Sequence, residues 1–354
     1  SANAYTLSAV SLDNVEKLFL SNFDTHATVT TVEADLMTGL TTVGLSSSGA
    51  DGDTTINGLT NNVDAEMRSG AGDLTLTYDG SYVVTGTADT QKLTVSSLTA
   101  GTFDAAGIET LNIHSELAKS TITATTSSAL ETVNVTGDKD LVNSTALVFA
   151  KVANGTTAEG FVDASTFTGK LTVDVSGSAS TVDVKGGTGD DTIKFAGTLT
   201  KNDVVDGGAG TDKLTITAAT LTDQLTGVKN VETFAFDPAT SAVAMDVSKL
   251  STGVTKVELD LADAANTGTV LSSTITNLGS QTVNLKHSAA DAADSGNDDG
   301  TKVTISAAAD TSADTINVTL DALGGWTSLN YGLRELDVAN YETVNINAVN
   351  DTAG

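Results

Sequence analysis

Short runs of alternating apolar and polar residues, separated by clusters of turn-forming residues, recur along the whole sequence. Clear examples are residues 74–78, 171–175, 214–216, 303–305 and 316–320. Alternation with a period of two, rich in Val, Ile and Thr, is typical of β-strands, and the Gly, Ser, Asn and Asp between the runs favour turns. The pattern predicts an all-β chain, in which only residues 11–20 and 288–294 are expected to form short helical turns.

The scarcity of proline and large aromatic residues bears on the architecture. The 354 residues include one proline, Pro238, and one tryptophan, Trp326. A β-sandwich usually places prolines on its edges and loops and large aromatic residues in its core. Small β-branched residues suit a narrow core between stacked strands. We therefore expect an elongated parallel β-solenoid or β-roll with irregular rungs, and a string of β-sandwiches remains the alternative.

An internal repeat supports the solenoid. It consists of an apolar residue, then Glu-Thr or Glu-Lys, then alternating apolar positions, with glutamates at Glu16, Glu109, Glu131, Glu232 and Glu342 and looser copies at Glu258 and Glu335. Seven of the 11 glutamates would thus occupy one local position. We interpret this residue as a solvent-facing or turn-capping group where each strand begins. The irregular spacing of the copies predicts rungs with insertions of variable length.

Two nine-residue segments carry the sharpest motif. Residues 186–194 and 207–215 both fit the pattern G-G-x-G-x-D-x-U-x, the nonapeptide of RTX calcium-binding rolls. Its glycines permit a left-handed backbone that turns carbonyl groups toward a shared centre. Its aspartate adds a hard anionic oxygen of the kind that calcium prefers. The predicted calcium-binding residues are Gly186, Gly187, Gly189, Asp190, Asp191, Asp206, Gly207, Gly208, Gly210 and Asp212.

This motif suggests three regions: β-rich repeats over residues 1–185, calcium-binding turns over 186–216 and further β-rich repeats over 217–354. Degenerate relatives of the motif occur at residues 70–74 and 309–316. Acid clusters occur at Asp51 with Asp53, and at Asp291, Asp294, Asp298 and Asp299. Each of these could hold calcium or be a solvated loop, and the loop is favoured for any one of them.

Charge and composition exclude several functions. The formal net charge of -28 and a sequence pI near 4.1 repel phosphate backbones, which disfavours nucleic-acid binding. The chain has no cysteine, hence no disulfide or thiolate chemistry. No apolar run approaches the ~18 residues of a membrane-spanning helix. His26, His114 and His287 are far apart in sequence, and neither H-E-x-x-H nor G-x-S-x-G occurs. We therefore expect no catalytic role.

The region around the two nonapeptides carries a more specific resemblance. Asp191-Thr-Ile is followed by the run from Asn202 to Leu214 and then by Val228-Lys-Asn-Val-Glu232-Thr-Phe. This order resembles the RTX-type surface-layer proteins of Gram-negative bacteria, which combine sparse G-G-x-G-x-D turns with repeated V/I-E-T strands and a Thr-rich, Cys-free composition. The resemblance at motif level covers residues 185–236. Elsewhere it is one of composition and strand motif.

The resemblance implies export by a type I secretion system, calcium-dependent folding outside the cell and assembly into a two-dimensional coat. The family usually has more calcium turns and a C-terminal secretion region, so we expect this chain to be a piece of a longer protein. Its expected partners are other copies of itself and a cell-surface anchor, for which lipopolysaccharide is a candidate. The alternatives are a calcium-dependent adhesin or biofilm matrix protein, and the roll-bearing tail of a secreted hydrolase.

Overall fold

The strand content of the protein is seen in a computed structural model. It describes residues 6–7, 11–22, 29–79, 88–150, 160–178, 181–195, 199–217, 225–237, 242–261, 271–286, 301–310, 312–321 and 333–349. These ranges contain strands β1 to β30 and one short 3-10 turn, η1 (Val247–Lys249). The prediction of an all-β chain with almost no helix is confirmed.

The helical turn expected at residues 11–20 is wrong. The second half of this segment is a strand, β2 (Lys17–Leu20), which pairs in parallel with β4 (Thr42–Ser46) so that Leu18 faces Val43. Pairing with a neighbouring strand outweighs the weak local preference of so short a segment. The other expected helical turn, at residues 288–294, lies outside the described residues, as does Trp326.

The chain divides into two compact units. The first consists of Ser1–Ile193 with Gly208–Gly210, and the second of Lys194–Gly207 with Thr211–Gly354. The strands of each unit fall into three groups, one for each sheet to which they belong.

In the first unit, group A1 has the order β1 (Thr6–Leu7), β3 (Thr30–Glu33), β5 (Thr54–Leu59), β7 (Leu74–Tyr78), β9 (Thr102–Ala105) and β12 (Ala124–Thr126). Group A2 has the order β2, β4, β6 (Asp64–Gly70), β8 (Thr90–Leu98), β10 (Thr110–Glu116), β13 (Thr132–Gly137), β15 (Gly160–Asp163) and β17 (Val182–Lys185). Group A3 has the order β11 (Ser120–Ile122), β14 (Leu141–Asn143), β16 (Leu171–Asp174) and β18 (Thr192–Phe195), and the last two residues of β18 already belong to the second unit.

In the second unit, group B1 consists of β19 (Val204–Asp206) and β21 (Val228–Lys229). Group B2 has the order β20 (Lys213–Ile216), β22 (Thr233–Phe236), β24 (Lys256–Asp260), β26 (Thr282–Lys286), β28 (Thr315–Asp321) and β30 (Thr343–Val349). Group B3 has the order β23 (Ala244–Asp246), β25 (Ser272–Leu278), β27 (Thr301–Ala307) and β29 (Leu333–Ala339).

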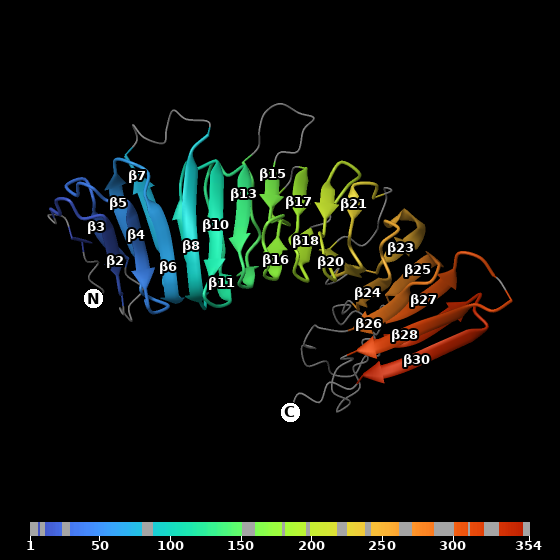
Figure 1. The fold of residues 1–354 in the computed structure, drawn as a ribbon. Coiled ribbons are helices and arrows are strands. Elements are labelled where there is room, and N and C mark those ends of the chain that lie inside the picture. Colours follow the sequence, from blue (N-terminus) through green and yellow to red (C-terminus); the bar gives the residue numbers. More distant parts are fainter. Residues whose placement is uncertain are drawn as a thin grey trace. The chain divides into compact units, whose positions relative to one another are not determined.

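Parallel pairing between strands that are not consecutive in sequence defines the architecture. For example, β4 pairs with β6 and β6 with β8, while β3 pairs with β5 and β5 with β7. The chain therefore alternates between sheets and returns beside its own earlier strand, as Figure 1 shows for the strands of group A2. We call the stretch from one strand to its next partner in the same sheet a winding. Long parallel sheets built this way are consistent with a β-solenoid or β-roll.

The core of each unit consists of apolar columns, because every second residue of a strand points inward. In the first unit, Leu111 and Ile113 are buried and pair with Val133 and Val135 of the next winding. Between them, Asn134 donates a side-chain hydrogen bond to Asn112 at 2.8 Å. Like residues thus stack on like, which fixes the register of neighbouring windings.

Candidate functional site

The first nonapeptide forms a turn between β17 and β18, and its aspartate is buried beneath that turn. Asp191 is 1% exposed. One carboxylate oxygen accepts the backbone N–H of Gly187 at 2.7 Å, and the other accepts the backbone N–H of Leu171, in the preceding winding, at 2.7 Å. The side chain therefore holds its own turn and the main chain of the neighbouring winding at once. Asp190, next to it, is exposed.

Electrostatics make the buried Asp191 carboxylate a favourable partner for a cation. Burial raises its pKa, the hydrogen bonds from Leu171 and Gly187 lower it, and the nearby charge of Asp190 raises it again; the net shift is upward. The two hydrogen bonds therefore do not fully offset the cost of burying the charge. A carboxylate supplies two anionic oxygens, which are hard acceptors. The donor chemistry fits a hard cation such as calcium.

The glycines of the motif stack on one another with no room for a side chain. Gly186 and Gly187 are both buried. A Cβ atom at Gly208 would overlap the carbonyl oxygen of Gly187, and one at Gly210 would overlap that of Gly189. Gly208 and Gly210 also have φ of 98° and 133°, in the left-handed region that favours glycine. The motif glycines thus form a close backbone cradle within the first unit.

One glycine of this column, Gly169, lies outside both nonapeptides. A Cβ atom at Gly189 would overlap the carbonyl oxygen of Gly169, so the stack of glycines extends one winding before the first nonapeptide. Gly169 precedes Lys170 and Leu171 without a second glycine or an aspartate of the motif. The only feature of the sequence that marks Gly169 is its position two residues before a strand, and glycines at such positions are too common to single it out.

The second nonapeptide places Asp212 in the second unit in a similar environment. Asp212 is 1% exposed, and a Cβ atom at Gly207 would lie 2.6 Å from its carboxylate oxygen Oδ2. The carboxylate therefore packs directly against the Gly207 backbone. Asp206 has other partners: it forms an ion pair with Lys229 at 2.9 Å and accepts a hydrogen bond from the Asn230 amide at 2.7 Å.

No three His, Asp or Glu side chains come together as a metal-binding group anywhere in the described ranges. The fit of the turns to calcium thus depends on the glycine cradle and on the two buried aspartates. The structure brings Gly187, Gly189, Gly208 and Gly210 of the predicted set together.

Acids outside the nonapeptides also bond to the main chain of a neighbouring winding. Asp53 accepts the backbone N–H of Asp73 at 3.2 Å, and Asp73 in turn accepts that of Thr102 at 2.6 Å. Burial raises the pKa of Asp53, as do the charges of Asp73 and Asp51, against the opposing hydrogen bond. The cluster Asp291, Asp294, Asp298 and Asp299 lies outside the described residues.

Three of the repeated glutamates cap the main chain where a strand begins. Each accepts the backbone N–H of an aspartate in the preceding winding: Glu109 from Asp89 at 2.8 Å, Glu232 from Asp212 at 2.7 Å and Glu342 from Asp314 at 2.7 Å. In each case the backbone N–H groups of the glutamate and of the following threonine both donate to the carbonyl of that same aspartate. We call this arrangement of side chain and main chain the glutamate clasp.

The prediction that seven glutamates share one position is wrong for two of them. Glu258 lies in the middle of β24, opposite Ala235, and Glu335 lies within β29, opposite Lys302. In the β24 winding, Thr255 occupies the position before the strand and donates its N–H to the Glu232 carbonyl at 2.9 Å. The local sequence around Glu258 resembles the motif, but strand pairing sets a different register.

Glu258 instead forms the centre of a cluster of lysines. It is 5% exposed and forms ion pairs with Lys256 at 2.8 Å, with Lys286 at 3.1 Å and with Lys213. The three lysines come from β24, β26 and β20, so the cluster spans four neighbouring strands of group B2. Sequence alone gave no signal for this network.

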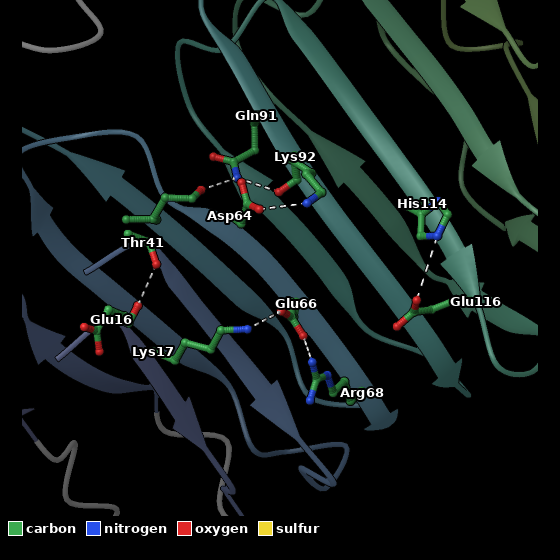
Figure 2. Close-up of polar contacts among 11 residues, drawn as sticks. Glu16, Lys17, Thr41, Asp64, Glu66, Arg68, Gln91, Lys92, His114 and Glu116 are labelled. Atoms are coloured by element: carbon green, nitrogen blue, oxygen red, sulfur yellow. Dashed lines mark hydrogen bonds and ion pairs between the residues drawn. The ribbon is translucent and has the colours of Figure 1, made fainter. Parts of the chain in front are cut away.

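Charged side chains also meet one another on the outer face of group A2, both within strands and between them, as Figure 2 shows. Lys92 pairs with Asp64 at 2.8 Å, and Glu66 contacts both Arg68 and, at 3.9 Å, Lys17. His114 lies on this face 3.8 Å from Glu116 and donates to or accepts from the Thr136 hydroxyl through Nδ1 at 3.0 Å. The Lys92–Asp64 and His114–Thr136 contacts join neighbouring strands, β8 with β6 and β10 with β13, whereas the Glu66–Arg68 and His114–Glu116 contacts each lie within one strand.

Comparisons with known proteins identify no relative: no family model, curated protein or solved structure matches the chain. A search of the described residues for a helix long and apolar enough to cross a membrane finds none.

Proposed function

We propose that the chain is part of a calcium-stabilised structural protein that forms a coat on the cell surface, of the RTX surface-layer type. The observation that carries the proposal is the pairing of a tight glycine stack with a buried motif aspartate: Gly208 and Gly210 lie over Gly187 and Gly189, and Asp191 is buried below. A backbone cradle with an anionic oxygen beside it offers the oxygen ligands that calcium takes.

Calcium has a stabilising role in this proposal. Bound ions offset the buried charges of Asp191 and of Asp212, each within its own unit, and receive further oxygen ligands from backbone carbonyls of the turns. Because the ion binds the folded chain and not the unfolded one, stability rises with free calcium. The proposed form is an elongated β-solenoid whose irregular windings include calcium-binding turns.

Assembly into a coat follows from the charge of the chain. A net charge of -28 keeps copies apart when calcium is low, because like charges oppose association. Calcium lowers this charge and bridges acidic loops on neighbouring copies. Magnesium replaces it poorly, because magnesium prefers smaller octahedral sites and keeps its water. The proposal includes type I secretion, an extracellular location and no enzymatic activity.

Light scattering during a calcium titration of the full-length protein tests the proposal, followed by negative-stain imaging of the product. We expect assembly above a calcium threshold, reversal by chelator and no equivalent response to magnesium. Regular two-dimensional arrays would support the coat. A protein that is folded and monomeric at millimolar calcium would exclude the coat-forming function.

A further inference from the structure

We propose that Glu232 is a positioning residue for the calcium-binding aspartate Asp212. It belongs to the winding after the second nonapeptide, outside the motif itself. The inference depends on the proposed calcium binding and adds to it a residue that decides how well one turn binds the ion.

The contacts between these two residues involve both polar groups of the Asp212 main chain. The Glu232 carboxylate accepts the Asp212 N–H at 2.7 Å. The Asp212 carbonyl accepts the N–H groups of Glu232 at 3.1 Å and of Thr233 at 2.9 Å. Peptide groups on both sides of the Asp212 Cα are therefore held by the next winding. This fixes the direction in which the Asp212 side chain leaves the backbone.

The direction of that side chain matters because the site is tight. Asp212 is 1% exposed, and its carboxylate lies against the backbone of Gly207. A small rotation of the peptide would move the carboxylate away from the turn or into Gly207. Residues that hold a metal ligand in place by hydrogen bonds affect metal affinity even though they do not touch the ion. Glu232 is such a residue for Asp212.

The chain provides its own comparison, because the glutamate clasp occurs at positions that differ in motif. Glu109 holds Asp89 through the same side-chain bond, at 2.8 Å, and through N–H bonds from Glu109 and Thr110 to the Asp89 carbonyl. Asp89 follows Thr87 and Ala88 and belongs to no nonapeptide. The clasp is thus a general structural device. Among the three clasps in the described residues, that of Glu232 acts on the aspartate of a complete nonapeptide, whereas that of Glu342 acts on Asp314 of the degenerate segment 309–316.

The experiment compares Glu232→Ala with the matched control Glu109→Ala in the full chain. The midpoint of thermal unfolding is measured against free calcium, starting from chelator, which separates basal stability from the response to the ion. We expect both variants to lose similar basal stability. Glu232→Ala should also need about ten-fold more calcium for the same increase in midpoint, whereas Glu109→Ala should need the same concentration as wild type.

Glu232→Gln completes the design, because glutamine keeps an oxygen that can accept the Asp212 N–H. A positioning role predicts that its calcium response stays close to that of wild type. Should Glu232→Ala fail to fold, Glu232→Asp replaces it: the shorter side chain keeps the charge but cannot reach, and its calcium response should weaken.

The outcomes separate this inference from the proposed function. If the midpoint of thermal unfolding of the wild type does not change with calcium, both calcium binding and the role of Glu232 are overturned. A wild-type midpoint that rises with calcium, together with equal responses of Glu232→Ala and Glu109→Ala, overturns the positioning role alone and leaves the clasp as a purely structural contact.

Discussion

The carboxylate of Asp191 accepts the backbone N–H of Leu171 at 2.7 Å, across 20 residues of sequence. An aspartate that the motif assigns to calcium thus also bonds two windings together. Its second bond, from Gly187 at 2.7 Å, closes its own turn. Substitutions at Asp191 should therefore have two separable effects, one that needs calcium and one that does not.

Replacing Asp191 and Asp212 by alanine should abolish most of the stabilisation that calcium provides. In chelator, the double variant should also be less stable than wild type by about 2 kcal/mol or more, since the buried N–H groups of Leu171 and Gly187 lose their acceptor. Thermal unfolding in calcium and in chelator measures both effects.

Asp73→Ala is the control for that experiment. Asp73 accepts one backbone N–H, from Thr102 at 2.6 Å, and belongs only to a degenerate motif. The Asp73→Ala variant should be about 1 kcal/mol less stable than wild type in chelator and should keep the wild-type response to calcium. Equal loss of the calcium response in the control and the double variant would remove the special role of the nonapeptides.

Gly208→Ala should destabilise the first unit by about 3 kcal/mol. The added Cβ would overlap the Gly187 carbonyl oxygen, and the φ of 98° is strained for alanine. The matched control is Gly253→Ala, where the nearest atom to a Cβ is the Val231 carbonyl oxygen at 3.6 Å. Chemical denaturation should show little change for the control, and similar losses in both variants would contradict the close stacking.

Glu258→Gln should lower the free energy of unfolding by about 3 kcal/mol, which would place it among the more damaging single substitutions in the second unit. It leaves the three clustered lysines without their shared carboxylate. Glu335→Gln is the control, because the Glu335 side chain is 56% exposed in its pair with Lys302. This substitution should lower the free energy of unfolding by less than about 1 kcal/mol. Urea unfolding at neutral pH compares them, and a neutral Glu258→Gln would show that the cluster adds no stability.

The same cluster predicts how stability depends on pH. Burial alone would raise the pKa of Glu258, but hydrogen bonds and charges from Lys213, Lys256 and Lys286 outweigh it and lower the pKa from 4.5 to about 2. A carboxyl group with a depressed pKa stabilises the fold above its unfolded pKa, and this contribution disappears as the pH falls from about 4.5 toward 2.

Between about pH 5 and about pH 2.5, wild type should therefore lose about 2 kcal/mol more than Glu258→Gln. Other carboxyl groups titrate in both proteins, so the difference between the two isolates Glu258. Urea unfolding at about pH 5 and about pH 2.5 measures it. Parallel losses in the two proteins would show that the lysines do not depress this pKa.

Much of the fold follows from local sequence. The alternation in residues such as Leu171, Val173 and Val175 predicts strands, and the paired glycines with Asp191 and Asp212 predict two special turns. The Glu-Thr repeat predicts a cap where a strand begins, which Glu109, Glu232 and Glu342 provide. These features need only a few neighbouring residues, because strand periodicity and turn geometry are local properties.

Only the tertiary structure decides which windings lie side by side and in what register. Glu258 matches the Glu-Thr repeat in outline, yet pairing of β24 with β22 places it opposite Ala235, among lysines up to 45 residues away. The clasp of Glu232 on Asp212 and the bond from Leu171 to Asp191 each join residues 20 apart. Such contacts depend on the length of every insertion between two strands and on the cumulative packing of the apolar columns. Local sequence therefore determines the elements and their turns, whereas strand pairing determines which polar groups meet.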